Sequence, residues 1–137
     1  MPPNGVAGSQ WVLGAVIDRL EELLSKAAIE RGTLTYAQVA RALELEPPHT
    51  IHQTTELLAA LMRKHASERV PQLASLVISR TRGGLPAPGF FMLLNELGLY
   101  GGSSDGDDAK AFHDAEKKRC YAAASSKGSE DVEARLR

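Results

Sequence analysis

The stretch Gly32-Thr-Leu-Thr-Tyr-Ala-Gln-Val-Ala40 decides the fold, because it marks where one helix ends and the next begins. Thr35 is followed three residues later by Gln38, the capping-box arrangement in which each side chain bonds the other residue's backbone N–H. We therefore expect a short helix to open at Thr35 and to stop before Pro47 and Pro48. Its buried edge is expected to consist of Val39, Ala40 and Leu43.

A second Thr-x-x-Gln pair, Thr50 and Gln53, predicts the start of a third helix that runs to about Ser67. Its apolar positions are Ile51, Leu57, Leu58, Leu61 and Met62. Two helices joined by a tight connection that contains proline are typical of a helix-turn-helix pair.

A long helix is expected upstream, over residues 9–31. Apolar residues recur there every three or four positions, which is the pattern of one buried helix face. Ser9 is the expected N-cap and Gly32 the expected left-handed C-cap. Residues 1–8, rich in Pro and Gly, are expected to be a flexible N-terminus.

A small β-hairpin is expected downstream of Pro71. The apolar run 73–79 predicts a strand, and Gly83-Gly84 predicts the hairpin tip. Residues 89–91 form either the second strand or, alternatively, the start of a helix that ends at Gly98.

A last helix is expected from Asp105 to Ala124, followed by a flexible tail over 125–137. Its inward residues are expected to be Ala111, Phe112, Ala115, Cys120 and Tyr121. The order of elements predicts a mainly α fold with a small β-hairpin wing, that is, a winged helix-turn-helix with extra N- and C-terminal helices. It forms one domain over residues 9–124.

Residues 32–40 resemble the start of the DNA-binding C-terminal domain of the alkylguanine-DNA alkyltransferases and the alkyltransferase-like proteins. In that family a Gly, a Thr or Ser before a Tyr, and an acidic or amide residue before a small apolar pair open the first helix of the pair. The similarity continues through Ile78-Ser-Arg-Thr-Arg-Gly-Gly-Leu-Pro-Ala-Pro-Gly-Phe90, where the family has a strand, a Gly-rich turn and Gly-Phe or Gly-Tyr. The resemblance covers roughly residues 32–90 and implies a DNA-binding module.

The active-site motif of that family is absent from the chain. Alkyltransferases carry Pro-Cys-His-Arg just before the strand, where the cysteine accepts the alkyl group. This chain has Arg69-Val-Pro-Gln-Leu-Ala-Ser75 there, and Cys120 lies too late in the sequence to replace that cysteine. The resemblance therefore implies DNA binding without alkyl transfer, and we expect no enzyme activity.

The expected DNA contacts come from three places: the start of the short helix, the third helix and the hairpin tip. A recognition helix places its N-terminal end in the groove, and a long cation near the tip can reach a phosphate. The candidates are Tyr36, His49, Thr50, His52, Gln53, Arg63, Arg80 and Arg82.

Each of these side chains also has a purely structural interpretation. Thr50 and Gln53 are explained by capping, Tyr36 by a place in the core, and Arg80 and Arg82 by a solvated hairpin edge. We expect no metal site. A zinc site usually has a cysteine pair or a His-Glu-x-x-His spacing, and neither accompanies His49 and His52. No cofactor is expected either.

Composition limits the partner and the compartment. The formal net charge is −1, which is low for a phosphate-binding protein, although residues 63–82 contain five basic residues and only one acidic residue. A single cysteine, no signal-peptide pattern and no long apolar run predict a cytoplasmic protein that does not enter a membrane.

The alternative hypothesis is a protein-interaction domain on the same scaffold. The near-neutral charge and the Asp-rich segment before the last helix favour it. It predicts that acidic residues interrupt the expected DNA surface, namely Glu44, Glu46 and Glu56. The wide apolar stripe of the first helix, or the Ala-rich last helix, would then form a homodimer interface.

Overall fold

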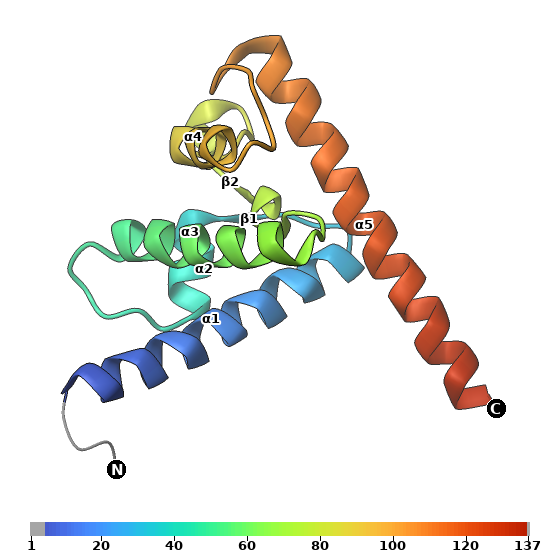
Figure 1. The fold of residues 1–137 in the computed structure, drawn as a ribbon, viewed down its shortest axis with the longest axis horizontal. Coiled ribbons are helices and arrows are strands. Elements are labelled where there is room, and N and C mark those ends of the chain that lie inside the picture. Colours follow the sequence, from blue (N-terminus) through green and yellow to red (C-terminus); the bar gives the residue numbers. More distant parts are fainter. Residues whose placement is uncertain (1–4, 137) are drawn as a thin grey trace.

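The computed structural model describes residues 5–136, with side chains for residues 13–126. The α-helices are α1 Gly5–Ile29, α2 Tyr36–Ala42, α3 Thr50–Glu68, α4 Pro88–Glu96 and α5 Gly106–Leu136. The strands are β1 Leu34–Thr35 and β2 Val77–Ile78, and the 3-10 turns are η1 Leu73–Leu76 and η2 Arg80–Arg82. The described chain is therefore mainly helical, with one small two-stranded sheet (Figure 1). None of these helices combines the length and the apolar character needed to cross a membrane.

The core lies where α1, α2 and α3 meet. Leu20 and Leu24 of α1, Val39 of α2 and Leu61 of α3 are fully buried there, and Phe91 of α4 closes the cluster. Removing such side chains from water contributes about 25 cal/mol for each Å² of apolar surface. This burial fixes α2 against α3, the helix pair expected from the sequence.

Helices α1 and α2 both end with a non-glycine residue in the left-handed region. Arg31 has φ 55°, and the N–H of Gly32 donates to the carbonyl of Ala27 at 2.8 Å. The expectation that Gly32 itself takes the left-handed conformation is therefore wrong by one residue. Glu44 caps α2 in the same way, with φ 55°, so that helix ends before the two prolines are reached.

The two predicted capping boxes differ. The box at Thr35 is confirmed, with the Gln38 N–H donating to Thr35 Oγ1 at 3.2 Å and the Thr35 N–H donating to Gln38 Oε1 at 2.8 Å. The prediction of a capping box at Thr50 is wrong. Helix α3 begins after His49, a residue at φ 63° whose side chain makes no capping bond.

The prediction of a β-hairpin is also wrong. β2 pairs with β1 in parallel, with Leu34 opposite Val77 and Thr35 opposite Ile78. Residues 73–76 of the predicted first strand form η1, and η2 forms at Arg80–Arg82, directly before the predicted tip Gly83-Gly84. Residues 88–96 form α4, which confirms the alternative of a helix ending near Gly98, a residue with φ 74°.

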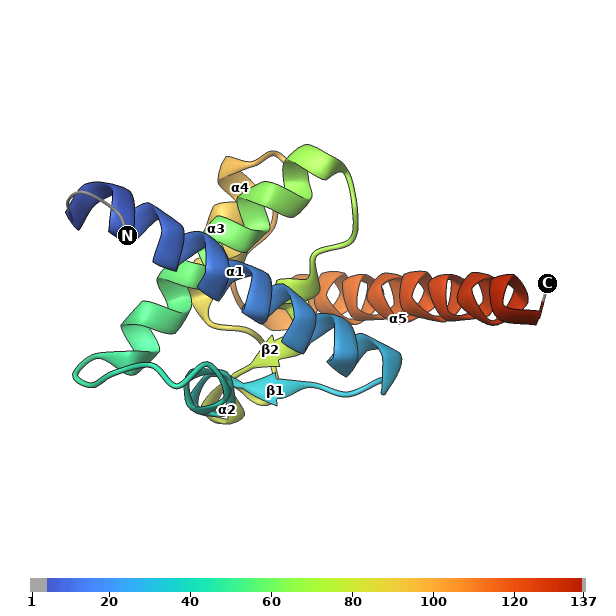
Figure 2. The ribbon, with the colours of Figure 1, turned by 90° about the horizontal axis from the view of Figure 1, so that it is seen from below.

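Helix α5 packs on η1 and on the end of α1, and its C-terminal half projects away from the other helices (Figures 1 and 2). Its inward face is mixed, since the polar residues His113 and Glu116 are buried together with Ala109 and Cys120. The prediction that Ala111 and Ala115 point inward is wrong, because both are exposed. The helix continues through Leu136, into the segment expected to be a tail.

Polar side chains attach α5 to the backbone of residues 72–75. Nε2 of His113 lies 2.7 Å from the Ser75 carbonyl oxygen, and a carboxylate oxygen of Glu116 accepts the Gln72 N–H at 2.8 Å. Burial lowers the pKa of His113. A sequence pattern that looks for an apolar face therefore misses how α5 docks.

Candidate functional site

The residues expected to read DNA at the start of α3 are largely engaged in other contacts. The side-chain amide of Gln53 donates to the carbonyls of Glu46 and Pro48, at 2.8 and 2.9 Å, and so holds the loop between α2 and α3. His52 lies 3.4 Å from Glu56, and both side chains are mostly exposed. His49 is exposed and Thr50 half-buried. An acidic group therefore stands on the surface expected to approach phosphate.

Two of the predicted arginines are also occupied. Arg63 forms an ion pair with Glu96 of α4 at 3.2 Å. The Nε atom of Arg82 donates to the Pro86 carbonyl at 2.9 Å, and its Nη2 atom donates to the carbonyl of Ser104. Arg82 thus ties residues 82–86 to the segment before α5 instead of standing at an exposed edge.

Tyr36 has a structural role. Its hydroxyl oxygen accepts the N–H of Ala87 at 2.8 Å, which connects the start of α2 to the start of α4. Burial raises the pKa of the phenol. The alternative interpretation of Tyr36, as a half-buried aromatic residue, is the one that agrees with its position.

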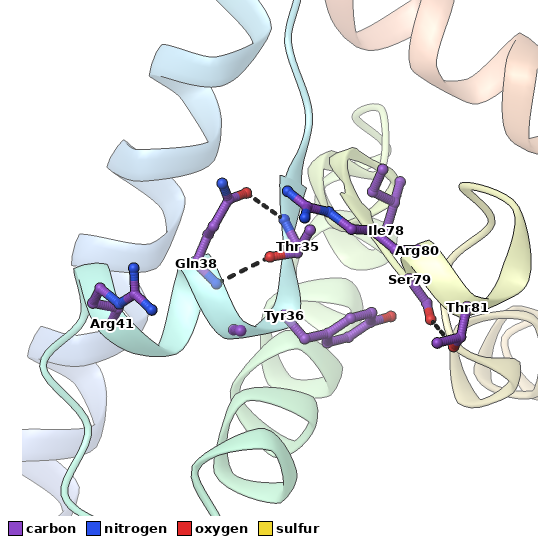
Figure 3. A pocket seen from close by; sticks show the side chains of 9 residues that line it. Thr35, Tyr36, Gln38, Arg41, Ile78, Ser79, Arg80 and Thr81 are labelled. Carbon is purple, nitrogen blue, oxygen red and sulfur yellow. Dashed lines mark hydrogen bonds between the residues drawn. The ribbon is translucent and has the colours of Figure 1, made fainter.

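The described surface has a groove beside these contacts, and the parallel pairing of β1 and β2 creates it. Because Thr35 lies opposite Ile78, the first turn of α2 comes beside the turn that follows β2. The groove has a volume of about 420 Å³. Its lining consists of Thr35, Tyr36, Ala37, Gln38, Arg41, Ile78, Ser79, Arg80 and Thr81 (Figure 3).

Two cationic side chains flank this groove, Arg41 from α2 and Arg80 from η2 (Figure 3). Both residues are exposed, and among the side chains of residues 13–126 neither forms an ion pair. Gln38 lies between them in this view, and because its Oε1 atom already accepts the Thr35 N–H, its amide nitrogen is left to donate. The groove therefore presents donors and positive charge.

The turn that carries Arg80 is held by its own backbone. The Ser79 N–H donates to the Leu85 carbonyl at 2.8 Å, and the Gly84 N–H donates back to the Ser79 carbonyl at 3.1 Å. Gly83 and Gly84, at φ 66° and 90°, supply conformations that other residues rarely adopt. The hydroxyls of Ser79 and Thr81 lie 2.9 Å apart at the groove. Arg80 is thus presented from a fixed position.

Cys120, the only cysteine in the chain, is 1% exposed. Burial raises the pKa of its thiol to about 11, so the thiolate is scarce near neutral pH. Its sulfur donates to the Gln72 carbonyl at 3.3 Å. This thiol belongs to the α5 attachment and is not presented to a substrate.

The structure thus brings together two predicted site residues, Tyr36 and Arg80, with two that were not selected from the sequence, Gln38 and Arg41. Gln38 was interpreted only as a capping residue. Arg41 lies outside the basic segment 63–82, and only the pairing of β1 with β2 brings it near Arg80. Searches of protein-family models, curated proteins and solved structures find no match to the chain.

Proposed function

We propose that the chain is a non-catalytic DNA-binding module that contacts the phosphodiester backbone through the groove between α2 and η2. The observation that carries the proposal is that Arg41 and Arg80, on its two sides, are exposed and form no ion pair with the side chains of residues 13–126. Guanidinium groups bind phosphate oxygens with charge-assisted hydrogen bonds, and the amide and hydroxyl donors around them suit the same ligand.

The proposed interface is smaller than the one expected from the sequence. It keeps Arg80 and the helix-turn-helix pair of α2 and α3, and it leaves out Arg63, Arg82 and Gln53, whose polar atoms are engaged within the protein. Two phosphate contacts also suit a chain of net charge −1, since the electrostatic contribution stays modest.

The first test is a fluorescence-anisotropy titration of the protein against a labelled random-sequence duplex at several salt concentrations. Two neutralised phosphates predict a slope of log K against log salt of about −2, with a dissociation constant in the range of roughly 10⁻⁴ to 10⁻⁶ M. Arg80→Ala should weaken binding to every duplex and make the slope shallower by about 1.

Lys110→Ala is the matched control, because it removes an exposed cation on α5, outside the groove. The proposal is wrong if the wild-type protein does not bind at low salt. It is also wrong if Lys110→Ala and Arg80→Ala reduce affinity and slope equally, because that result would indicate a diffuse charge effect.

A protein partner is a second candidate function, favoured by a more apolar groove between α3 and α4. This groove of about 420 Å³ is lined by Leu58, Met62, Phe90 and Leu93, and the neighbouring Met92 is 64% exposed. Ile29, at the end of α1, is 68% exposed, so the prediction of a homodimer through the first helix also stays open to test. Light scattering coupled to size exclusion, with Met92→Ser and Ile29→Ser compared, distinguishes these two surfaces.

A further inference from the structure

A second cluster of polar groups lies where α1 passes the C-terminal end of α3. Glu21 comes from α1, and His65 and Glu68 come from the last turns of α3. One ligand atom from each of the three residues can be chosen so that all three atoms lie within 4.8 Å of one another. Residues 44 positions apart in the sequence therefore place two carboxylates and one imidazole at a single point.

The histidine of this cluster is held by the core. His65 is 2% exposed, and its Nε2 atom lies 2.6 Å from Oε2 of Glu21. Its Nδ1 atom is buried without a hydrogen-bond partner. A ring fixed in this way presents Nε2 toward the carboxylates and has little freedom to turn elsewhere.

Lys64 completes the surroundings of Glu21. Its ammonium group lies 2.8 Å from Oε1 of Glu21, the oxygen that does not face His65. Each oxygen of the Glu21 carboxylate therefore contacts a different neighbour. The hydrogen bond from Lys64 is the main cause that lowers the pKa of Glu21. Glu21 is therefore ionised and oriented by its neighbours.

We propose that Glu21, His65 and Glu68 form a binding site for a divalent transition metal ion such as Zn²⁺, which links α1 to α3. A mixed set of one imidazole nitrogen and two carboxylate oxygens suits Zn²⁺ and similar ions better than Mg²⁺ or Ca²⁺, which prefer oxygen alone. Three protein ligands leave a fourth position for water. Lys64 then acts as an outer partner that holds the ligating carboxylate.

The geometry requires small adjustments in both directions. Ligand atoms about 2.1 Å from a tetrahedral ion lie about 3.4 Å apart, so separations of up to 4.8 Å must close by at most about 1.4 Å, while the 2.6 Å between His65 Nε2 and Glu21 Oε2 must widen by about 0.8 Å. Glu68 is exposed and is the last residue of α3, so its side chain is free to move inward.

This inference departs from the expectation of no metal site. That expectation rested on His49 and His52, which lie near Glu56 but lack the spacing of a metal site. Glu21 and His65 are brought together only by the packing of α1 on α3. Local spacing carries no information about that contact.

The test is isothermal titration calorimetry of the full chain with ZnCl₂, before and after Glu68→Gln. We expect one saturable site in the wild-type protein and at least tenfold weaker binding in Glu68→Gln. This variant removes a charge at an exposed position and should leave the fold intact, which its circular dichroism spectrum checks. Zn²⁺ should also raise the melting temperature of the wild-type protein, since it binds the folded state, and Mg²⁺ should not.

Two matched variants control for adventitious binding. Glu22→Gln removes the neighbouring exposed carboxylate of α1, and His52→Gln removes the exposed His52–Glu56 pair. Both should bind Zn²⁺ as the wild-type protein does. The proposal is overturned if the wild-type protein shows no saturable binding, if Glu22→Gln loses as much affinity as Glu68→Gln, or if His52→Gln abolishes binding while Glu68→Gln retains it.

Discussion

The groove between α2 and η2 and the exposed surface of α3 both carry polar side chains, but they differ in what those side chains already contact. On α3 the polar groups are engaged: Arg63 with Glu96, His52 with Glu56, and Gln53 with two loop carbonyls. In the groove, Arg41 and Arg80 are exposed and lack a carboxylate partner among the described side chains. Charge that is not neutralised within the protein is the charge that is available to a ligand.

The largest effect is expected for Arg82→Ala, which removes the support of the groove. Arg82 is half-buried and donates to the carbonyls of Pro86 and Ser104, so its loss leaves both acceptors without this partner. Hydrogen bonds from a charged donor predict a loss of about 2 kcal/mol in the free energy of unfolding. Urea denaturation measures this change, and an unaltered midpoint would show that Arg82 does not hold the turn.

The double variant Arg41→Ala/Arg80→Ala should affect binding and spare stability. Losing both phosphate contacts predicts roughly tenfold weaker DNA affinity, about 1.4 kcal/mol, and a salt slope near zero. Anisotropy titrations give both values, and a urea melt of the same preparation checks the fold. Retention of the wild-type slope would mean that the phosphate contacts lie elsewhere.

Gln53→Ala should show the opposite behaviour. The amide bonds to Glu46 and Pro48 hold the loop before α3, and their loss predicts a destabilisation of about 1 kcal/mol. DNA affinity should stay within twofold of wild type at a temperature well below the melting point. A large drop in affinity with unchanged stability would restore the start of α3 as the contact surface.

The smallest effect is expected for Arg63→Ala. Its pair with Glu96 is exposed on both sides, at 57% and 65%, so solvent screens it and its contribution to stability is at most about 0.5 kcal/mol. Because its charge is already neutralised, DNA affinity and salt slope should also be unchanged. A salt slope shallower by 1 in the anisotropy titration would return Arg63 to the interface.

Local signals in the sequence predicted where the helices lie but not all of their ends, because α1 begins at Gly5, before the expected N-cap Ser9, and α5 continues past Ala124. The apolar spacing of α1 and α3 and the capping box of α2 are properties of neighbouring residues, and the chain follows them. The second Thr-x-x-Gln pair shows the limit of such signals. Gln53 follows a threonine by three residues, as Gln38 does, but its amide bonds the loop carbonyls of Glu46 and Pro48, which the Pro-Pro connection brings within reach.

Contacts between distant residues could not be predicted in this way. The apolar run at 73–79 has the composition of a strand, and a Gly-Gly turn beside it suggests a hairpin, but its partner is Leu34-Thr35, more than forty residues earlier. That pairing creates the groove and brings Arg41 near Arg80. Because local spacing does not reveal this contact, Arg41 was not selected from the sequence. Likewise, His113 and Glu116 are buried on the inward face of α5 because the backbone of Gln72 and Ser75 offers them groups to bond.

The measurement that tests the central claim most directly is a ¹H–¹⁵N NMR titration that follows the arginine Nε–Hε signals as an unlabelled duplex is added. Each arginine then reports separately whether it meets phosphate. The account predicts that the signals of Arg41 and Arg80 shift with saturation while those of Arg63 and Arg82 stay in place. Shifts confined to Arg63 and Arg82, or no shifts at concentrations where the DNA is bound, would contradict it.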